Sequence, residues 1–536
     1  MTEPPIEQLP VESGPPIDPP LESGRRVARG EGSTRAGRRS SRGGVGVHQL
    51  PWRTVTNPFR PLEVLTDDQI EAIHNASLRI LAEIGMDFLH PEALSILSAG
   101  GARVEDGTQR VRFDPDWVIE TVSTVPASFT LYARNPDHNL TMGANHINFA
   151  TVGSAPNSSD ADRGRRTGTF EDYTNLVKLG QYFNTIHLYG GYPVEPVDLP
   201  PATRHLDCLA AFATLSDKVF HAYSLGRQRI IDGLEIVRIA RGIDVEQLAN
   251  EPSLFTVVNT SSPLRLDGPM IEGLVEMAKA GQAVVVTPFT LSGAMAPASI
   301  AGALAQQNAE ALATIALTQL VNPGAPVMYG GFTSNVDMRS GAPAFGTPEY
   351  TRAAFAGGQL ARRYGIPYRS SNACAANAVD AQAAYEAEMS TWGAVMGHAN
   401  MVMHGAGWME GGLVASFEKF IIDVEILQMM SETLLPLKID EAELAVDAIA
   451  EVGPGGHFFG SPHTLERYET AFYTPLVSDW RNFESWEEAG SPGAADHANR
   501  LWKQALTEFA PPPLAEDRAA ELDDFVARRK SEGGVG

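Results

Sequence analysis

The chain has 536 residues, 43% of them hydrophobic and 20% charged, and its net charge of −24 argues against nucleic acid as a partner. Its two cysteines, Cys208 and Cys374, are far apart and form no CxxC motif, so the sequence indicates neither a disulfide framework nor a cysteine-based zinc site. Since no run of about 18 apolar residues and no apolar leader occurs, we expect a soluble, cytoplasmic protein without a membrane partner.

The first part of the chain divides into a tail and a small folded extension. Residues 1–50 are rich in Pro, Gly, Ser and Arg and contain almost no bulky apolar side chains. Such a segment cannot bury enough surface to offset its ordering entropy, so we expect it to be disordered. Residues 51–147 predict an α/β extension that begins with a helix after Thr66, where apolar residues recur every three to four positions.

From residue 148 onward, short apolar β-rich runs alternate with longer amphipathic stretches. The predicted strands are 148–155, 185–192, 219–225, 254–260, 283–291, 327–334, 367–372 and 401–408. The predicted helices are 170–183, 201–215, 228–241, 268–280, 299–322, 348–364, 378–396 and 418–432. Three N-caps and three C-terminal glycines support these bounds: Thr169, Asp267, Thr347, Gly242, Gly281 and Gly365.

Eight βα units across 148–435 predict a (β/α)8 TIM barrel, whose usual size is about 250 residues. A doubly wound open sheet would also alternate, but it rarely needs eight parallel strands, and no GxGxxG motif follows the first strand. Residues 436–536 read as helices separated by a glycine turn and a run of three prolines. The predicted fold class is therefore α/β, a (β/α)8 barrel with an N-terminal α/β extension and a C-terminal helical extension.

Active sites of such barrels lie at the C-terminal strand ends, and here those ends combine aromatic, polar and glycine residues. Aromatic faces bind a quaternary ammonium group, which has no proton to donate, while polar neighbours orient a carboxylate. The predicted substrate-binding residues are Tyr189, Tyr192, His221, Tyr223, Phe289, Tyr329, Phe332, Asn335, Arg369, His404, Trp408 and Glu410. Glycines that would let a large, flat cofactor approach the backbone are Gly190, Gly191, Gly330, Gly331, Gly405 and Gly407.

Each of these residues also has a purely structural interpretation. A lone Tyr or Phe in a strand usually fills the core, and paired glycines at strand ends form tight turns. His404 alternates with Val402 and can point into an interior network, while Asn184 and His187 suit the barrel floor. The aromatic residues are informative only because they recur at the same end of several strands.

Other reaction types find little support. No GxSxG, HExxH or Walker sequence is present, no metal-ligand spacing occurs, and no catalytic residue is identified. If the nucleophile belongs to a partner's cofactor and the leaving group is a neutral amine, an enzyme needs mainly positioning and electrostatics. The missing acid–base set agrees with that kind of reaction.

From about residue 50 onward, the sequence resembles the trimethylamine methyltransferase family, the corrinoid-linked methylamine and betaine methyltransferases. The most specific stretches are 329–349 (YGGFTSNVDMRSGAPAFGTPE), 453–458 (GPGGHF) and 511–514 (PPPL), and the Arg-rich lead into 45–52 is also similar. The resemblance implies a TIM barrel that docks a small corrinoid-binding protein over its strand ends. The Co(I) of the partner's corrinoid (cobalamin) would accept the methyl group, and this chain would bind no metal itself.

The same resemblance bears on the substrate. Archaeal trimethylamine enzymes of the family carry pyrrolysine in the site, whereas this chain contains only standard residues, like the glycine betaine methyltransferases. A quaternary amine is therefore favoured, and a homo-oligomer is plausible. Two alternatives stay open: a corrinoid-independent barrel enzyme acting on a methylated amine, and a non-catalytic betaine-binding protein.

Overall fold

The computed structural model describes residues 46–535, so the predicted tail at 1–45 lies outside the described part of the chain. Residues 46–50, which we assigned to that tail, are anchored on the barrel. The backbone N–H of Val47 donates to the Tyr182 hydroxyl at 3.1 Å, and that of Leu50 donates to the Gln428 side chain at 2.8 Å. Described structure begins earlier than composition indicated because hydrogen bonds, together with packing of Val47 against the core, hold these residues.

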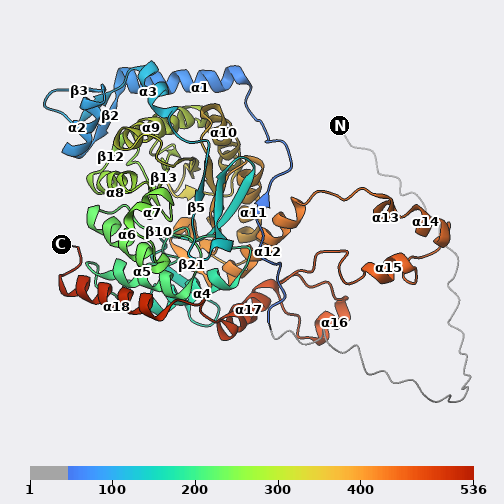
Figure 1. Ribbon diagram of the computed structural model, residues 1–536. Helices are drawn as coiled ribbons and strands as arrows, with labels where there is room; N and C mark the ends of the chain where they lie inside the picture. The colour runs from blue at the N-terminus through green and yellow to red at the C-terminus, as the bar shows by residue number, and fades with distance from the viewer. Residues whose placement is uncertain (1–45, 536) are drawn as a thin grey trace, which may run out of the picture. The chain divides into compact units, whose positions relative to one another are not determined.

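Parallel strands form the wall of a closed barrel (Figure 1). In chain order they are β7 (His146–Thr151), β10 (Phe220–His221), β11 (Leu254–Val258), β13 (Ala283–Val286), β15 (Val327–Gly330), β18 (Tyr368–Ser371) and β19 (Met401–Ala406). Each named strand from β10 onward pairs in parallel with the next, and β19 returns to pair with β7. The predicted α/β fold with a TIM barrel is confirmed.

The predicted second strand, 185–192, is reduced to single bridges. Leu188 is bridged to Ala150 on one side and to Val219 on the other, which completes the ring. Side chains occupy the backbone groups that a longer ladder would use: His187 Nδ1 accepts the N–H of Phe149 at 2.9 Å. The eighth strand is therefore present as one paired residue.

Eight helices surround the barrel in the predicted order (Figure 1). They are α4 (Phe170–Tyr182), α5 (Arg204–Leu215), α6 (Arg227–Arg241), α8 (Gly268–Lys279), α9 (Ile300–Val321), α10 (Pro348–Tyr364), α11 (Ala381–Met396) and α12 (Phe417–Thr433). The three predicted N-caps each accept a backbone N–H from the first turn, and the three predicted glycines have left-handed φ angles. Within residues 46–535, no helix is both long and apolar enough to cross a membrane.

A hydrophobic cluster fills the barrel interior and reaches its N-terminal end. Its wall residues are Ala150, Leu188, Val219, Phe255, Ala283, Val285, Met328, Met401 and Met403. A hairpin of β5 (Ser128–Leu131) and β6 (Leu140–Gly143) adds Leu131, Leu140 and Met142 to the same cluster. The hairpin therefore covers the barrel floor.

The buried Lys218 fixes the floor. Its ammonium donates to the carbonyls of Gly180, Phe183 and Ile186 at 2.8, 3.0 and 2.6 Å, and it lies 5.2 Å from the Trp52 ring centroid. Three hydrogen bonds satisfy all the donors of an ammonium group. With its three donors so occupied, Lys218 has a structural role at the floor.

The N-terminal extension packs on α9. It contains β1 (Val55–Thr56), α1 (Asp67–Arg79), a π-helical turn η1 (Ile80–Ile84), β2 (Met86–Phe88), α2 (Pro91–Ala99), β3 (Arg103–Val104), β4 (Arg110–Arg112) and α3 (Pro115–Val122). A 3-10 turn η2 (Pro136–His138) lies within the β5–β6 hairpin. Strands β2, β3 and β4 form a sheet with β12 (Arg265–Leu266) from a barrel loop, and the short α7 (Val245–Asn250) follows α6.

Two small sheets lie in the loops beyond the C-terminal strand ends. One contains β14 (Leu291–Ser292), β16 (Ser334–Val336) and β17 (Pro343–Ala344). The other contains β8 (Asn157–Asp160), β9 (Gly164–Thr167), β20 (Trp408–Met409) and β21 (Val414–Ser416), with a 3-10 turn η3 (Glu410–Gly412). These sheets fix the loops that carry five of the predicted site residues: Phe289, Phe332, Asn335, Trp408 and Glu410.

The C-terminal extension has two parts. Helix α17 (Ala494–Glu508) packs on α12 and α4, and α18 (Glu516–Ser531) packs on α5 and α6. Between α12 and α17 lie four short helices with no buried residue, α13 (Glu441–Leu444), α14 (Val446–Val452), α15 (Pro462–Arg467) and α16 (Phe483–Glu488). The prediction of helices is correct here, but only α17 and α18 wrap the barrel.

A buried ion pair on α12 holds the end of the last barrel strand. The carboxylate of Asp423 accepts the Gly407 N–H at 2.8 Å and pairs with the Lys419 ammonium, and both charged side chains are fully buried. Burial raises the pKa of Asp423, while Lys419 and these hydrogen bonds favour its charged form. The pair therefore fixes the turn that leads from β19 to Trp408.

We predict that Asp423→Ala lowers the free energy of unfolding by about 3–5 kcal/mol, because it leaves the Lys419 charge buried and unpaired. The double variant Lys419→Met/Asp423→Leu should be destabilised less, by about 1–3 kcal/mol relative to the unmodified chain. This remaining loss is expected because the Gly407 N–H no longer has an acceptor. Denaturant unfolding measures both. Lys279→Met on α8, which removes an exposed ammonium from its ion pairs with Glu92 and Glu276, is the control and should change little. Equal loss in the single and double variants would contradict the assignment.

Candidate active site

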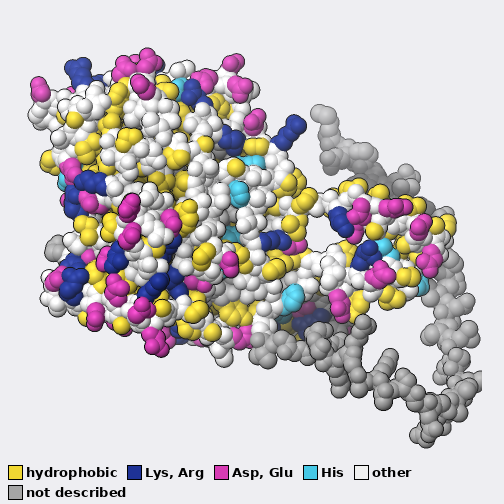
Figure 2. Space-filling view, in the orientation of Figure 1, with side chains coloured by type: hydrophobic (Ala, Val, Ile, Leu, Met, Phe, Trp, Pro, Cys, Tyr) yellow, Lys and Arg dark blue, Asp and Glu magenta, His cyan; other side chains and the backbone are white. Residues whose placement is uncertain are grey.

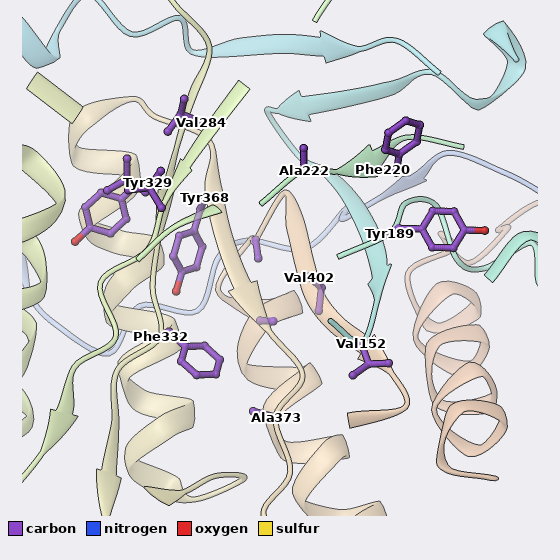
Figure 3. Close-up of a cluster of buried hydrophobic side chains, with 14 of the residues drawn as sticks. Val152, Tyr189, Phe220, Ala222, Val284, Tyr329, Phe332, Tyr368, Ala373 and Val402 are labelled. Atoms are coloured by element: carbon purple, nitrogen blue, oxygen red, sulfur yellow. The ribbon is translucent and has the colours of Figure 1, made fainter. Parts of the chain in front are cut away.

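Because side chains alternate along a strand, some predicted site residues point into the barrel and others point outward to the helices. On β15, Met328 belongs to the interior cluster, so Tyr329 points outward and donates to Asn308 of α9 at 3.0 Å. Tyr189 likewise donates to the Val177 carbonyl of α4 at 2.8 Å. Figure 3 shows both tyrosines among packed core side chains. The structure places these two predicted residues in the core between barrel and helices.

Five rings from the ends of β13, β15 and β19 and from the loop after β17 lie close together, and we call them the aromatic cluster: Phe289, Phe332, Phe345, His404 and Trp408. The Phe332 centroid lies 5.2 Å from that of Phe289, 5.4 Å from Phe345, and 6.2 Å from both His404 and Trp408. His404 and Trp408 are 4.0 Å apart. The structure thus brings together four predicted residues and one, Phe345, that sequence reasoning missed.

His404 reaches this cluster through a break in strand alternation. Met403 belongs to the interior cluster and Val402 to the outer core, so regular alternation would point His404 outward like Val402. Instead His404 has a φ of 56°, and the register between β19 and β7 shifts between Val402 and Ala406. An irregularity of this kind re-aims a side chain, and here it turns the imidazole toward Phe332 and Trp408.

Arg369 of β18 is the charged centre of the site. Its side chain is 3% exposed, its guanidinium carbon lies 5.2 Å from the Phe332 centroid, and Nη1 donates weakly to the Gly331 carbonyl at 3.4 Å. Its Nε has no partner, and no carboxylate in residues 46–535 forms an ion pair with it. Burial lowers the pKa of Arg369 to about 10. A buried guanidinium without a counter-ion is unusual and costly.

His221 of β10 presents a second unpaired donor. Its Nε2 accepts the N–H of Val257 at 3.0 Å, which assigns the imidazole hydrogen to Nδ1. Nδ1 is buried and has no partner. Burial, with a smaller effect of Arg369, lowers the pKa of His221 to about 3, and burial lowers that of His404 far below its usual value. Both imidazoles are therefore neutral.

Tyr223 and Tyr192 border His221. The Tyr223 hydroxyl lies 2.8 Å from Ser154 Oγ and accepts the N–H of Tyr192 at 3.0 Å. The Tyr192 ring packs edge-on against Tyr173 of α4 at 5.6 Å. Tyr223 thus lies beside the site, whereas Tyr192 connects it to the helical layer.

The six predicted cofactor glycines are packed against this chain rather than toward a free surface. A Cβ on Gly330 would lie 2.2 Å from Thr287 Oγ1, and one on Gly331 would lie 2.9 Å from the Tyr368 hydroxyl. Those on Gly190 and Gly405 would meet the backbone of β7, and one on Gly407 would meet Val152 and Phe420. These glycines allow close packing of strands and helices. Only Gly191 adjoins site residues, with Tyr223 and His221 nearest.

Asn335 and Glu410 lie at the rim. Asn335 Oδ1 accepts the Thr347 hydroxyl at 3.1 Å, which ties β16 to the start of α10. Glu410 has a φ of 51° and forms an ion pair with Arg165 at 3.0 Å. Both are half-buried, and Glu410 is already neutralised by its partner.

Sequence reasoning missed Phe345 and Asn372. Phe345 lies within the stretch 329–349, which we had singled out as family-specific, so that stretch was the available signal. Asn372 follows β18 and donates to the Gly405 carbonyl at 3.1 Å, while its Oδ1 is buried without a partner. Nothing in the sequence marks Asn372, because its position depends on the pairing of β18 with β19.

Several buried polar atoms at this end of the barrel have no hydrogen-bond partner among residues 46–535. They are Arg369 Nε, His221 Nδ1, His404 Nδ1, Trp408 Nε1 and Asn372 Oδ1. Because buried polar groups are normally paired, such a concentration indicates a ligand position. Hydrogen-bond donors thus lie here beside aromatic surfaces. No group of three or more His, Cys, Asp or Glu side chains in the described chain is arranged for a metal ion.

Comparison with known proteins agrees with this description. The model of a family described as trimethylamine methyltransferase (MTTB) matches residues 31–534. The glycine betaine methyltransferase of Desulfitobacterium hafniense (strain Y51) is 38% identical over 472 residues, which cover 88% of this chain and 98% of that protein. The trimethylamine methyltransferase MttB of D. hafniense (strain DSM 10664 / DCB-2) is 28% identical, covering 88% and 94%.

Among solved structures, the monomethylamine methyltransferase MtmB of Methanosarcina barkeri aligns over 89% of each chain with 11% identity and a TM-score of 0.48. The family match spans nearly the whole sequence, and the resemblance drawn from the motifs is confirmed. The chain therefore belongs to the trimethylamine methyltransferase family and is a methyltransferase.

Proposed function

We propose that this chain transfers a methyl group from a betaine, a small quaternary ammonium carboxylate, to the corrinoid of a partner protein. The observation that carries the choice of substrate is the buried Arg369, which lacks a carboxylate partner in residues 46–535. A substrate carboxylate would supply the missing counter-ion and accept charge-assisted hydrogen bonds. Trimethylamine has no acidic group, so its binding would leave Arg369 uncompensated.

The neighbouring imidazole supports the same choice. Neutral His221 offers an Nδ1–H donor, and donation to a carboxylate requires no change of protonation near neutral pH. His404 Nδ1 and Trp408 Nε1 are further buried atoms without partners. Together these groups favour an anionic end on the ligand.

The aromatic cluster supports a cationic end. The rings of Phe289, Phe345 and Trp408 all contact Phe332, whose face lies beside Arg369. A contact between an aromatic face and a quaternary ammonium group contributes about 0.5–2 kcal/mol to binding. A betaine places its two charges a few bonds apart, which suits a site with both features. The 38% identical relative, a glycine betaine methyltransferase, agrees with this assignment.

The proposed reaction requires this chain mainly to position the substrate. The corrinoid supplies the reduced metal centre that accepts the methyl group. As the N–CH3 bond breaks, its electron pair stays on nitrogen and the amine leaves neutral, so no proton donor is required. Arg369 and His221 would hold the carboxylate, and Phe332 and Trp408 would fix the ammonium and exclude water.

The corrinoid is assigned to the partner because the glycines of this chain do not fit it. Five of the six would direct a Cβ at this chain's own strands or helices, so they form no cradle for a large, flat group. The methyl acceptor would therefore approach the C-terminal strand ends from outside.

Reduced cobalamin, as a substitute for the partner, tests the proposed function. We expect methylcobalamin to form when the purified chain is incubated with cob(I)alamin and glycine betaine, proline betaine or carnitine. Choline and trimethylamine, which lack a carboxylate, should give much less product. Absorbance spectroscopy and detection of the demethylated amine measure the reaction. Tight betaine binding with no methyl transfer, even with a corrinoid protein present, would favour a non-catalytic binding protein.

We predict that Arg369→Met weakens betaine binding about 10- to 100-fold, because a charge-assisted hydrogen bond contributes about 1.5–3 kcal/mol. Calorimetric titration measures the affinity. Stability should not fall, since the variant removes an unpaired buried charge. The matched control is Arg362→Met on α10, whose guanidinium donates to the Gly397 carbonyl at 2.9 Å away from the site. Unchanged affinity in the Arg369 variant would refute the carboxylate assignment.

We predict that Phe332→Leu and Trp408→Leu each lower the ratio of the affinity for glycine betaine to the affinity for an uncharged analogue of its ammonium group. The expected decrease is about 3- to 30-fold, which is the loss of one cation–π contact. The comparison ligand is 3,3-dimethylbutanoate, which keeps the carboxylate and shape of glycine betaine but has no positive charge. Competition binding gives the ratio of the two affinities. Arg369→Met should weaken both ligands alike, and Tyr189→Phe, which alters the outer core, should leave the ratio unchanged. A normal ratio in the folded double variant would reject the aromatic cluster as the cation site.

A further inference from the structure

Charged side chains are spread over the visible surface of the protein (Figure 2), but α9 buries an unusual number of polar side chains. This helix packs between the strands β13 and β15 and the helices α1 and α3 of the N-terminal extension. Seven of its buried residues are polar: Gln306, Gln307, Asn308, Glu310, Thr314, Thr318 and Gln319. Buried polar groups are costly unless they are paired, so their partners are informative. Those of Gln307 lead to the candidate active site.

The two chain segments that carry Phe289 and Phe332 are not paired where these rings lie. The ladder between β13 and β15 and the ladder between β14 and β16 leave an interruption, in which 287–290 faces 330–333. Phe289 and Phe332 are the third residues of these two intervals, and their ring centroids are 5.2 Å apart. Pairing of the strands therefore does not by itself set the separation of the rings.

Two threonine hydroxyls join the segments across this interruption. Thr290 and Thr333 directly follow the two rings, both are buried, and their hydroxyls are hydrogen-bonded to each other. The Thr333 hydroxyl also donates to Gln307 Oε1 at 2.6 Å. Because a hydroxyl has one hydrogen, Thr290 is the donor in the bond between the threonines. We call these three side chains the polar link, since they connect both ring-bearing segments to α9.

Gln307 is itself held in place from the side away from the site. Its Nε2 lies 3.4 Å from the Tyr329 hydroxyl, which donates to Asn308 Oδ1 at 3.0 Å. Asn308 Nδ2 donates to the Tyr364 hydroxyl of α10 and to Ser77 Oγ of α1, both at 2.9 Å. A connected set of buried polar groups makes its surroundings rigid. The amide of Gln307 is therefore fixed by the helical layer and the N-terminal extension.

We propose that Gln307 is a positioning residue. Through Thr333 and Thr290 it sets the separation of the Phe289 and Phe332 rings, and thereby the size of the ammonium group that the site accepts. The inference rests on the proposed function, in which the aromatic cluster binds the ammonium group. Apolar side chains of the same shape would give nearly equal stability, so stability alone does not require the polar link.

Selectivity between head groups of different size tests the proposal. The probes are glycine betaine and its N,N,N-triethyl analogue, which have the same carboxylate and the same positive charge. We expect Thr333→Val and Gln307→Leu each to lower the ratio of the two affinities about 3- to 10-fold, the equivalent of one net hydrogen bond. Competition binding measures the ratio. Thr333→Ser keeps the hydroxyl and should keep the ratio of the unmodified chain.

Thr314→Val is the matched control. Thr314 is a fully buried residue of α9, about two turns from Gln307, and its hydroxyl donates to the Glu310 carbonyl at 2.8 Å. Its loss should leave the ratio unchanged, whatever its effect on the Tm. The double variant Thr333→Val/Gln307→Leu should change the ratio no more than either single variant, because both break the same link. An unchanged ratio in folded Thr333→Val, or an equal change in Thr314→Val, would overturn the proposal.

The order of the rings can also be measured without a ligand, which separates this inference from the proposed function. With 4-fluorophenylalanine in place of Phe332, the fluorine NMR signal should be single and sharp. It should become broad or multiple when Thr333→Val is added. If the unmodified chain does not bind glycine betaine more tightly than 3,3-dimethylbutanoate, the assignment of the cation site fails. The fluorine signal then decides the role of the polar link alone, and identical signals in the two proteins would refute that role.

Discussion

The pairing of β19 with β7 closes the barrel, and the site depends on that closure. The register sets Met401 opposite Asn148 and Val402 opposite Phe149, after which it shifts before Ala406 meets Thr151. Because parallel strands end at the same edge, closure brings His221, Phe332, Arg369 and His404 to one end of the barrel despite their separation in sequence. The register shift that accompanies closure also turns His404 inward. Closure and site geometry therefore have a common origin.

The two buried cations of the barrel differ in their partners. At the floor, the Lys218 ammonium has three carbonyl partners, although the nearby His187 Nε2 is buried without one. At the other end, Arg369 Nε has no partner, and Nη1 donates only weakly to the Gly331 carbonyl at 3.4 Å. Buried charged groups are normally paired. Lys218 is therefore satisfied by the protein itself, whereas the proposed substrate carboxylate would complete the hydrogen bonds of Arg369.

The surroundings of Arg369 explain how such a site remains folded. The Phe332 face lies 5.2 Å from the guanidinium carbon and gives partial compensation, and the two nearby histidines are kept neutral. Burial nevertheless lowers the pKa of Arg369, because the protein replaces the lost hydration of the guanidinium only in part. A zwitterionic ligand would supply the missing negative charge without adding net charge to the interior. Under the proposed function, the cost of burying Arg369 would thereby become selectivity for a ligand with a carboxylate.

Sequence alone determined the order of the fold. Apolar periodicity and capping residues such as Thr169 and Gly365 are local signals, and all eight barrel helices occur where they were expected. It also pointed correctly to Phe332, Arg369, His404 and Trp408 as neighbours at one barrel end, because parallel strands in a barrel share that end. Family membership followed from motifs such as 329–349, which need no spatial information.

Only the tertiary structure decided which way each strand residue faces. All four residues of β15 are fully buried and none carries a charge, so nothing in the sequence distinguished inward Met328 from outward Tyr329. The glycines at the strand ends read as space for a cofactor, yet that space is filled by neighbouring strands and helices. His404 required knowledge of the register shift, and Phe345 and Asn372 required loops to be placed in space. Local patterns determine elements, whereas facing and register depend on contacts between residues far apart in the chain.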